Sequence, residues 1–240
     1  MPATPFDSAI WRSLFHDKTV ATLFTDTAVL RAELLVMGTL ALTQAKAGVM
    51  PEICAKAIQR AAMEVQIDPA ALGPVTAETR DPIAALVVQF KDEMKAPQYA
   101  KWVHFKGDSA ATKATALSLR LRQVINHFEE KLAGQAQGDA LSKIKEQTLL
   151  AFHPDPTLRG SIAAGLGLND AGDVTPAAAL SPFAEWIAQT ASTTKADTEV
   201  TQSLQASVPH MAKLLDKNAA QTTVAMILPQ LCLGLAVLLR

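Results

Sequence analysis

The stretch Trp102-Val-His-Phe-Lys-Gly-Asp-Ser-Ala-Ala-Thr-Lys-Ala-Thr-Ala-Leu-Ser-Leu-Arg-Leu-Arg-Gln-Val-Ile-Asn-His-Phe-Glu-Glu-Lys-Leu132 decides the fold. It opens as a connection with aromatic residues and a glycine, and it becomes the best-formed helix of the chain from about Ser109 to Gly134. Asp108 or Ser109 can cap the start of this helix, and Gly134 can end it. Apolar side chains recur along it at helical spacing and form one stripe, made of Ala110, Ala114, Leu117, Leu121, Val124, Ile125, Phe128 and Leu132.

The chain on either side of this helix also has the periodicity of helices, and no stretch predicts a strand. Further helices are predicted over residues 26–47, 51–64, 82–94, 138–152, 156–167, 181–193, 196–216 and 219–239. Connections are predicted at residues 1–24, as an irregular arm with short helical turns, and at 66–80 and 95–108. Asp26 or Thr27 can cap the helix that Gly48 ends, and Ser181-Pro182 opens another. The predicted fold class is therefore all-α, with long helices suited to a bundle.

The composition argues against several classes of function. The chain has 240 residues and a net charge of −1, so it has no electrostatic attraction to nucleic acid or to an anionic membrane surface. Its two cysteines, Cys54 and Cys232, lack the spacing of a metal site and are expected to be buried thiols in a reducing cytosol. The sequence has no glycine-rich phosphate loop and no signal-peptide pattern. We therefore expect a cytoplasmic protein without a metal or cofactor.

The C-terminal segment from Val224 to Leu239 is almost wholly apolar and leaves two interpretations open. A membrane-spanning helix needs about 20 such residues. This segment is shorter, contains Pro229 and Gln230, and lacks a flanking basic cluster. A helix in the interior of a bundle or an oligomer is the favoured interpretation, and a membrane anchor is the alternative.

The stretch 102–132 resembles a signature segment of the fumarase/aspartase superfamily. The most similar branch is the bacterial 3-carboxy-cis,cis-muconate cycloisomerases, whose version reads approximately W-V-H-x-G-A-T-S-Q-D-x-x-D-T-A-L-x-L-R-L. Residues 5–8 and 47–51, Pro-Phe-Asp-Ser and Ala-Gly-Val-Met-Pro, resemble the opening of that branch, and residues 162–168 resemble a later segment. The resemblance implies a shortened version of a mainly helical fold, with a long-helix bundle in an oligomer whose active sites form between subunits. It also implies carboxylated substrates and proton transfer beside a carboxylate.

The first substrate-binding motif of this branch, G-x-T-S-Q-D, is largely altered. Aligned at residues 106–111, the chain keeps the serine as Ser109, has Asp108 at the threonine position, and has alanine at the glutamine and aspartate positions. Asp108 adds a negative charge where a carboxylated substrate would dock. His104 matches the histidine upstream of the motif. The resemblance thus implies that His104 and Ser109 bind substrate, with a structural hydrogen bond and a helix cap as their alternative roles.

The second family motif has no counterpart, and the third is altered. The third is a mobile loop, G-S-S-x-M-P-x-K-x-N-P, whose nearest match is residues 205–211. His210 matches the branch, while the catalytic serine position holds Ala206, with Ser207 beside it and out of register. The resemblance implies Ser207 and His210 as catalytic residues, and ordinary loop residues are the alternative. His153 lies in the turn-like sequence Phe-His-Pro-Asp-Pro and is not taken as a member of the second motif.

The sequence predicts two domains, an N-terminal helical domain at residues 1–105 and an abbreviated helical-bundle domain at 106–240. A shortened bundle leaves apolar helix faces to cover, so we expect a homo-oligomer built on the helices 109–134 and 219–239. Residues with the pattern of an ordinary charged helix face are Arg31, Glu33, Arg120 and Arg122.

Three functions are consistent with these observations. The leading prediction is a divergent relative of the cycloisomerases that has lost the parent lactonising or lyase reaction and either binds a small carboxylate or acts through its assembly. The alternative is an active cycloisomerase or lyase with a site rebuilt from His104, Ser109, Ser207 and His210. The third is a membrane-anchored interaction protein.

Overall fold

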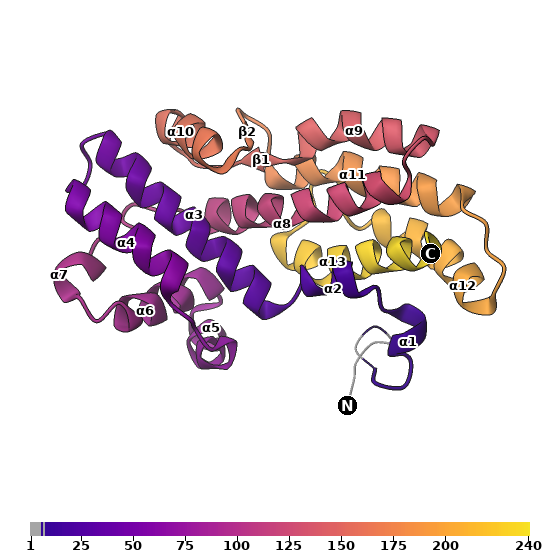
Figure 1. Ribbon diagram of the computed structural model, residues 1–240, viewed down its shortest axis with the longest axis horizontal. Coiled ribbons are helices and arrows are strands. Elements are labelled where there is room, and N and C mark those ends of the chain that lie inside the picture. The colour runs from indigo at the N-terminus through magenta and orange to yellow at the C-terminus, as the bar shows by residue number, and fades with distance from the viewer. Residues whose placement is uncertain (1–5, 7) are drawn as a thin grey trace. The chain divides into compact units, whose positions relative to one another are not determined.

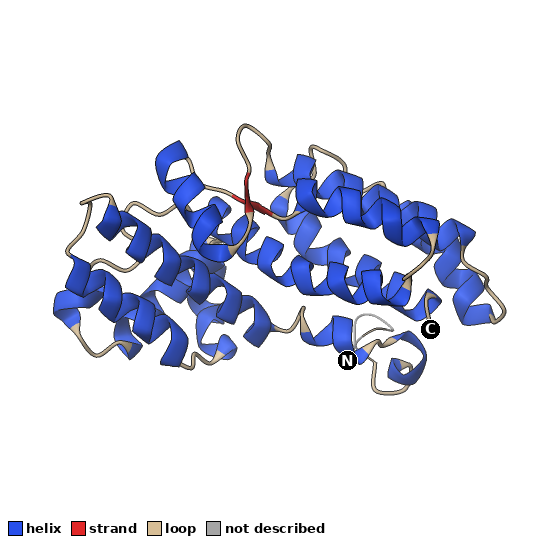
Figure 2. Ribbon diagram, turned by 45° about the horizontal axis from the view of Figure 1, so that its top comes forward, coloured by secondary structure: helices blue, strands red, loops and turns tan. Residues whose placement is uncertain are grey.

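The structure is a computed structural model that describes residue 6 and residues 8–240. Pro5 and Asp7, two of the residues behind the resemblance at 5–8, lie outside the described residues. The described chain is almost entirely helical, which confirms the all-α class (Figure 2). It divides into two compact units: unit 1 contains the residues up to 24, 121–149 and 173–240, and unit 2 contains 25–120 and 150–172. Each unit combines separate stretches of the chain, whereas the sequence predicts two contiguous domains that meet at residue 105.

Unit 2 is built around two neighbouring helices, α3 (Asp26–Lys46) and α4 (Glu52–Glu64), which lie side by side in Figure 1. Gly38 on α3 lets the two helices approach, because a Cβ atom there would lie 3.2 Å from the Cβ of Ala62. The core of the unit contains the buried side chains Leu34, Met37, Ile58, Ile83, Leu86 and Phe90. The other elements are η1 (Pro69–Leu72), α5 (Gly73–Thr79), α6 (Pro82–Glu93), α7 (Pro97–Ala100), the first half of α8 (Ser109–Lys131), β1 (Leu150–Ala151), α10 (Pro156–Leu166) and β2 (Asn169–Asp170).

Unit 1 contains the second half of α8, the long helix that the sequence predicts. Its aromatic core includes Phe183 and Trp186, whose rings stack with centroids 5.9 Å apart and an interplanar angle of 8°. The indole N–H of Trp186 donates to the carbonyl oxygen of Gln137 at 2.9 Å, so this large side chain is both buried and hydrogen-bonded. The other helices are α1 (Arg12–Phe15), α2 (Lys18–Thr22), α9 (Ala136–Thr148), α11 (Pro176–Thr193), α12 (Glu199–Ala212) and α13 (Gln221–Leu238).

The apolar C-terminal segment forms α13, in which every residue from 231 to 238 is buried. Gly234 packs closely against α12, because a Cβ atom there would lie 2.8 Å from a methyl carbon of Val208. By length and composition, α3 and α13 are the two described helices that could cross a membrane. Within the most apolar 18-residue segment of each helix, 61% of α3 and 56% of α13 are buried. Core helices pass the same test, so this is weak evidence for a span. The choice between an interior helix and an anchor stays a prediction.

Several predicted helix boundaries are confirmed, and the cap of α3 is now assigned. Gly48 and Gly134 have φ values of 72° and 77°, the left-handed conformation expected of a glycine that ends a helix. Thr25, rather than Asp26 or Thr27, caps α3, because its hydroxyl oxygen accepts a hydrogen bond from the backbone N–H of Ala28 at 3.3 Å. Cys54 and Cys232 are free and buried, as predicted.

Three predictions about secondary structure are wrong. Residues 66–80 are not a loop, because they contain η1 and α5, each with a proline in its first turn, where the missing N–H costs no helix bond. The helix predicted to open at Ser181 begins at Pro176, capped by Thr175, and it continues through Pro182. The helix predicted to reach residue 152 ends at Thr148 and is followed by β1, which pairs in parallel with β2.

Candidate functional site

His104 lies in the connection before α8 and is held in a specific orientation. Its Nε2 atom is 3.0 Å from the hydroxyl oxygen of Thr112, which lies in the first turn of α8. Its ring covers Gly107 so closely that a Cβ atom there would lie 2.5 Å from ring atoms. Its backbone has a φ of 54°, in the left-handed region. Burial lowers the pKa of His104, although the nearby carboxylates of Asp81 and Asp108 act to raise it, so the neutral imidazole is favoured.

The start of α8 resolves which residue caps the helix. The carboxylate of Asp108 accepts a hydrogen bond from the backbone N–H of Ala111 at 2.6 Å, so Asp108 is the cap. The hydroxyl of Ser109 is then directed elsewhere and donates to the carboxylate of Asp81 at 2.5 Å. The ammonium group of Lys113, one turn further along α8, lies 3.6 Å from the other oxygen of Asp81. Ser109 and Lys113 therefore both contact a carboxylate of the same chain.

Asp81 is the centre of this group of contacts. It caps the start of α6, because its Oδ1 atom accepts a hydrogen bond from the backbone N–H of Ile83 at 3.1 Å. Burial acts to raise the pKa of Asp81, but the hydrogen bonds from Ser109 and Ile83 and the charge of Lys113 outweigh it, so the pKa lies below its usual value. Asp81 is ionised at neutral pH. Its side chain and that of Lys113 each remain 29% exposed, so water and small solutes can reach them.

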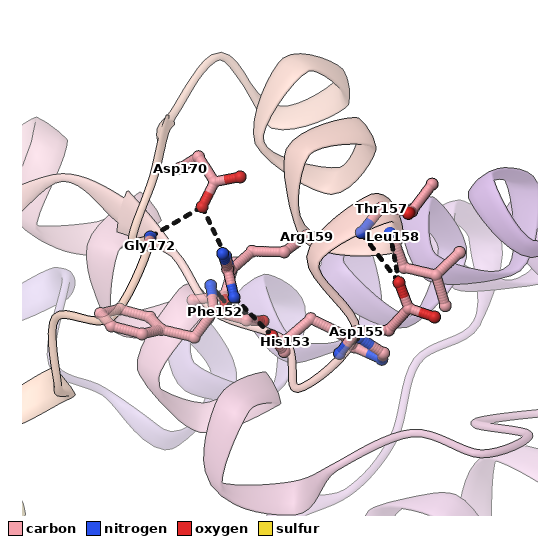
Figure 3. Close-up of polar contacts among 9 residues, drawn as sticks. Phe152, His153, Asp155, Thr157, Leu158, Arg159, Asp170 and Gly172 are labelled. Atoms are coloured by element: carbon pink, nitrogen blue, oxygen red, sulfur yellow. Dashed lines mark hydrogen bonds and ion pairs between the residues drawn. The ribbon is translucent and has the colours of Figure 1, made fainter.

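A second polar cluster occupies the turn between β1 and α10 (Figure 3). Arg159 donates through Nε to the carboxylate of Asp170 at 2.5 Å and through Nη1 to the carbonyl oxygen of His153 at 3.3 Å. The Nδ1 atom of His153 accepts from the backbone N–H of Asp155 at 3.1 Å. Its Nε2 atom is buried and has no hydrogen-bond partner. Burial lowers the pKa of His153, so the neutral ring is favoured. Because Nδ1 accepts a hydrogen bond, the neutral ring carries its proton on Nε2.

This turn is attached to α8 through Thr115. The Thr115 hydroxyl accepts from the backbone N–H of Phe152 at 2.9 Å and lies 3.3 Å from the carbonyl oxygen of the same residue. Burial is the main influence on the pKa values of His104 and His153, and the carboxylate of Asp108 acts to raise both, so the two rings lie within electrostatic range of the same carboxylate. Unit 2 therefore gathers two neutral histidines, a serine and two aspartates around the start of α8.

Glu33 is a buried acid in the same unit. It lies on α3 and is only 4% exposed, so the prediction that it belongs to a charged surface face is wrong. Burial raises its pKa to about 7, although the positive charges of Arg120 and Lys113 act in the opposite direction. Near neutral pH this carboxyl is about half protonated. A buried acid with such a pKa is a common feature of functional sites, and it is also found in structural networks.

Ser207 and His210 lie in unit 1, on α12. Both side chains are exposed, and the Ser207 hydroxyl lies 3.4 Å from the carbonyl oxygen of Leu204, in its own helix. The helix predicted over residues 196–216 is confirmed, because α12 continues through Pro209 to Ala212, so Ser207 and His210 are not loop residues. The structure thus brings His104 and Ser109 into one cluster in unit 2, and it places Ser207 and His210 together on one helix of unit 1.

The arrangement of these helices is shared with known enzymes. Neither a protein-family model nor the sequence of a curated protein matches the chain. Among solved structures, the chain is similar to the 3-carboxy-cis,cis-muconate lactonizing enzyme from Pseudomonas putida, with a TM-score of 0.85 and 16% identity over 97% of this chain and 75% of that chain. The chain has the fold of the fumarase/aspartase superfamily.

Two further solved structures have this superfamily fold. The β-carboxy-cis,cis-muconate cycloisomerase from Acinetobacter calcoaceticus sp. ADP1 has a TM-score of 0.74 and 17% identity over 96% of this chain and 76% of that chain. The fumarate lyase from Mesorhizobium sp. BNC1 has a TM-score of 0.66 and 14% identity over 93% of this chain and 73% of that chain. At these identities the similarity establishes the fold alone.

Sequence analysis did not identify Asp81, Glu33 or His153 as members of the candidate site. Asp81 precedes a proline and has the pattern of a helix cap, which it is, and its second role depends on a contact between residues 28 positions apart. Among the described residues, no group of three or more histidines, cysteines, aspartates and glutamates is arranged to hold a metal ion.

Proposed function

We propose that this chain is a non-catalytic relative of the muconate cycloisomerases that keeps a remnant of the carboxylate-binding position at His104 and Ser109. The observation that carries the proposal is that both residues are already engaged within the chain. The hydroxyl of Ser109 donates to Asp81, and His104 is hydrogen-bonded to Thr112. Groups that bind a substrate must be free to exchange their bonds with water for bonds with that substrate.

The charge of the cluster also supports the loss of the parent reaction. Asp81 and Asp108 supply two negative charges at the start of α8, and Lys113 supplies one positive charge near them. A carboxylated substrate would therefore meet net repulsion at the position where the catalytic enzymes need donors. The two alanines, Ala110 and Ala111, stand where the signature segment has polar side chains, so their side chains supply no replacement donors.

We propose that the protein acts in the cytoplasm as an assembly of several subunits. We expect a homo-oligomer in which α8 and α13 provide the contacts between subunits. The solved enzymes with this fold support a protein that needs no membrane, and the burial of residues 231–238 within unit 1 supports an interior role for α13.

Turnover measurements test this proposal directly. The purified full chain is incubated with 3-carboxy-cis,cis-muconate and, separately, with its lactone, and the ultraviolet absorbance of the muconate is followed. We expect no conversion above the buffer rate in either direction. Light scattering coupled to size-exclusion chromatography should give a mass that is a multiple of the 25.5 kDa chain. Conversion that is lost in the His104→Ala variant would refute the proposal.

The alternative is an active lyase or cycloisomerase with a rebuilt site. It is favoured by one observation, which is that burial keeps His104 neutral and thus able to accept a proton near neutral pH. In that case Ser109, which lies in the same unit, would supply a further group. The same turnover experiment separates the two functions, because the alternative requires a rate that falls when His104 is replaced and when the pH drops below the pKa of its imidazole.

A further inference from the structure

The contacts of Asp81 resemble those of a bound ligand. A substrate carboxylate held at this position would accept a hydrogen bond from a serine hydroxyl and pair with an ammonium group. Asp81 does both, at 2.5 Å to Ser109 and 3.6 Å to Lys113. It also lies within electrostatic range of His104, whose pKa it acts to raise.

We propose that Asp81 is a built-in carboxylate that occupies the Ser109 hydroxyl and the Lys113 ammonium group and so closes the start of α8 to carboxylate ligands. The inference rests on the proposed function only in taking His104 and Ser109 as the remnant of a carboxylate position. Asp81 then determines the specificity of this position in two ways, because it takes the donors and because its charge repels a second carboxylate.

Replacing Asp81 with asparagine should open the position. Asparagine caps helices about as well as aspartate, so its amide oxygen can keep the hydrogen bond from the backbone N–H of Ile83 at the start of α6. The substitution removes the negative charge and frees Lys113 and Ser109 to bind an added carboxylate. Both Asp81 and Lys113 are partly exposed, so a small dicarboxylate can reach them from solvent.

The chain offers a matched control in Asp68. This aspartate begins η1 and caps it in the same way, because its Oδ1 atom accepts from the backbone N–H of Ala70 at 3.0 Å. Asp68→Asn therefore changes the net charge by the same amount and replaces the same kind of cap. It leaves the contacts among Asp81, Ser109 and Lys113 unchanged.

The experiment measures binding of succinate, and of its neutral diamide succinamide, to the full chain by isothermal titration calorimetry. Asp81→Asn should bind succinate roughly tenfold more tightly, or better, than either the wild type or Asp68→Asn, whereas succinamide should show no such gain. The double variant Asp81→Asn with Ser109→Ala should lose most of that gain. Thermal unfolding without ligand confirms that each variant is folded, and Asp81→Ser, which keeps a capping oxygen, provides the same comparison if Asp81→Asn is unstable.

Equal succinate affinity in Asp81→Asn and Asp68→Asn would overturn the inference, and so would a gain that survives the loss of the Ser109 hydroxyl. Neither result bears on turnover. Conversion of muconate by the wild-type chain would refute the proposed function instead, so the two failures are distinguishable.

Discussion

Replacing Glu33 with glutamine will remove a pH dependence of stability that the wild-type chain carries. Burial on α3 raises the pKa of Glu33 to about 7, against an ordinary value of 4.5 for the unfolded chain. Between these values the folded state holds a proton that the unfolded state has released. The contribution of the protonated carboxyl to stability is therefore fully present below pH 4.5, and it is lost as the pH rises through about 7.

The magnitude follows from the separation of the two pKa values, which is about 2.5 pH units (7 minus 4.5). At about 1.4 kcal/mol per unit, the full effect is about 3.5 kcal/mol. About 2 to 3 kcal/mol of this loss in unfolding free energy occurs as the pH rises from 5 to 8. Glu33 is only 4% exposed, so solvent screening does not reduce this figure substantially.

The assay is urea denaturation of the wild type and of Glu33→Gln at several pH values from 5 to 8. The difference in unfolding free energy should shift in favour of the variant by about 2 to 3 kcal/mol across that range. Comparing the two chains at each pH cancels the constant effect of burying an amide. Glu78→Gln serves as the control, because Glu78 is exposed in the same unit. If the wild type and Glu33→Gln lose stability in parallel as the pH rises, the assignment of a raised pKa to Glu33 is refuted.

Three further predictions concern packing and reactivity. Gly107→Ala should lower the unfolding free energy by about 1–3 kcal/mol in urea, because its Cβ would overlap the ring of His104; an unchanged midpoint would contradict the orientation of that ring. Thr115→Val should cost about 1–3 kcal/mol in the same assay, because it leaves the backbone N–H of Phe152 without its acceptor. Cys232 should resist Ellman's reagent until the chain unfolds, because burial raises its pKa; rapid labelling of the folded chain would contradict its burial.

Much of the fold could be predicted from the sequence because the relevant signals are local. The long helix α8 was predicted from its apolar stripe, and glycines with positive φ mark two helix ends. Two of the three errors concern prolines. Pro182 has the pattern of a first helical residue, but the competing pair at residues 175–176 provides both a cap and a proline at N1, and α11 begins there. A sequence with two valid start signals does not reveal which one the packing favours.

The candidate site could be predicted only in part, because its key contacts join residues distant in sequence. His104 and Ser109 were identified through a resemblance that is carried by a local motif. Asp81 contributes to the cluster because α6 begins beside the start of α8, and no periodicity predicts that contact. Glu33 has the sequence pattern of an ordinary charged-face residue, and its burial depends on what packs against α3.

The distribution of satisfied and unsatisfied polar groups indicates where a ligand would bind. Ser109 and His104 already have partners, so a ligand that used them would have to displace a bond of nearly equal strength. The Nε2 atom of His153 differs, because it is buried without a partner and in the neutral ring it is a donor. A buried donor without an acceptor destabilises the fold until an acceptor arrives. His153→Ala in the Asp81→Asn background tests whether this donor contributes to succinate binding, and an unchanged dissociation constant would show that it does not.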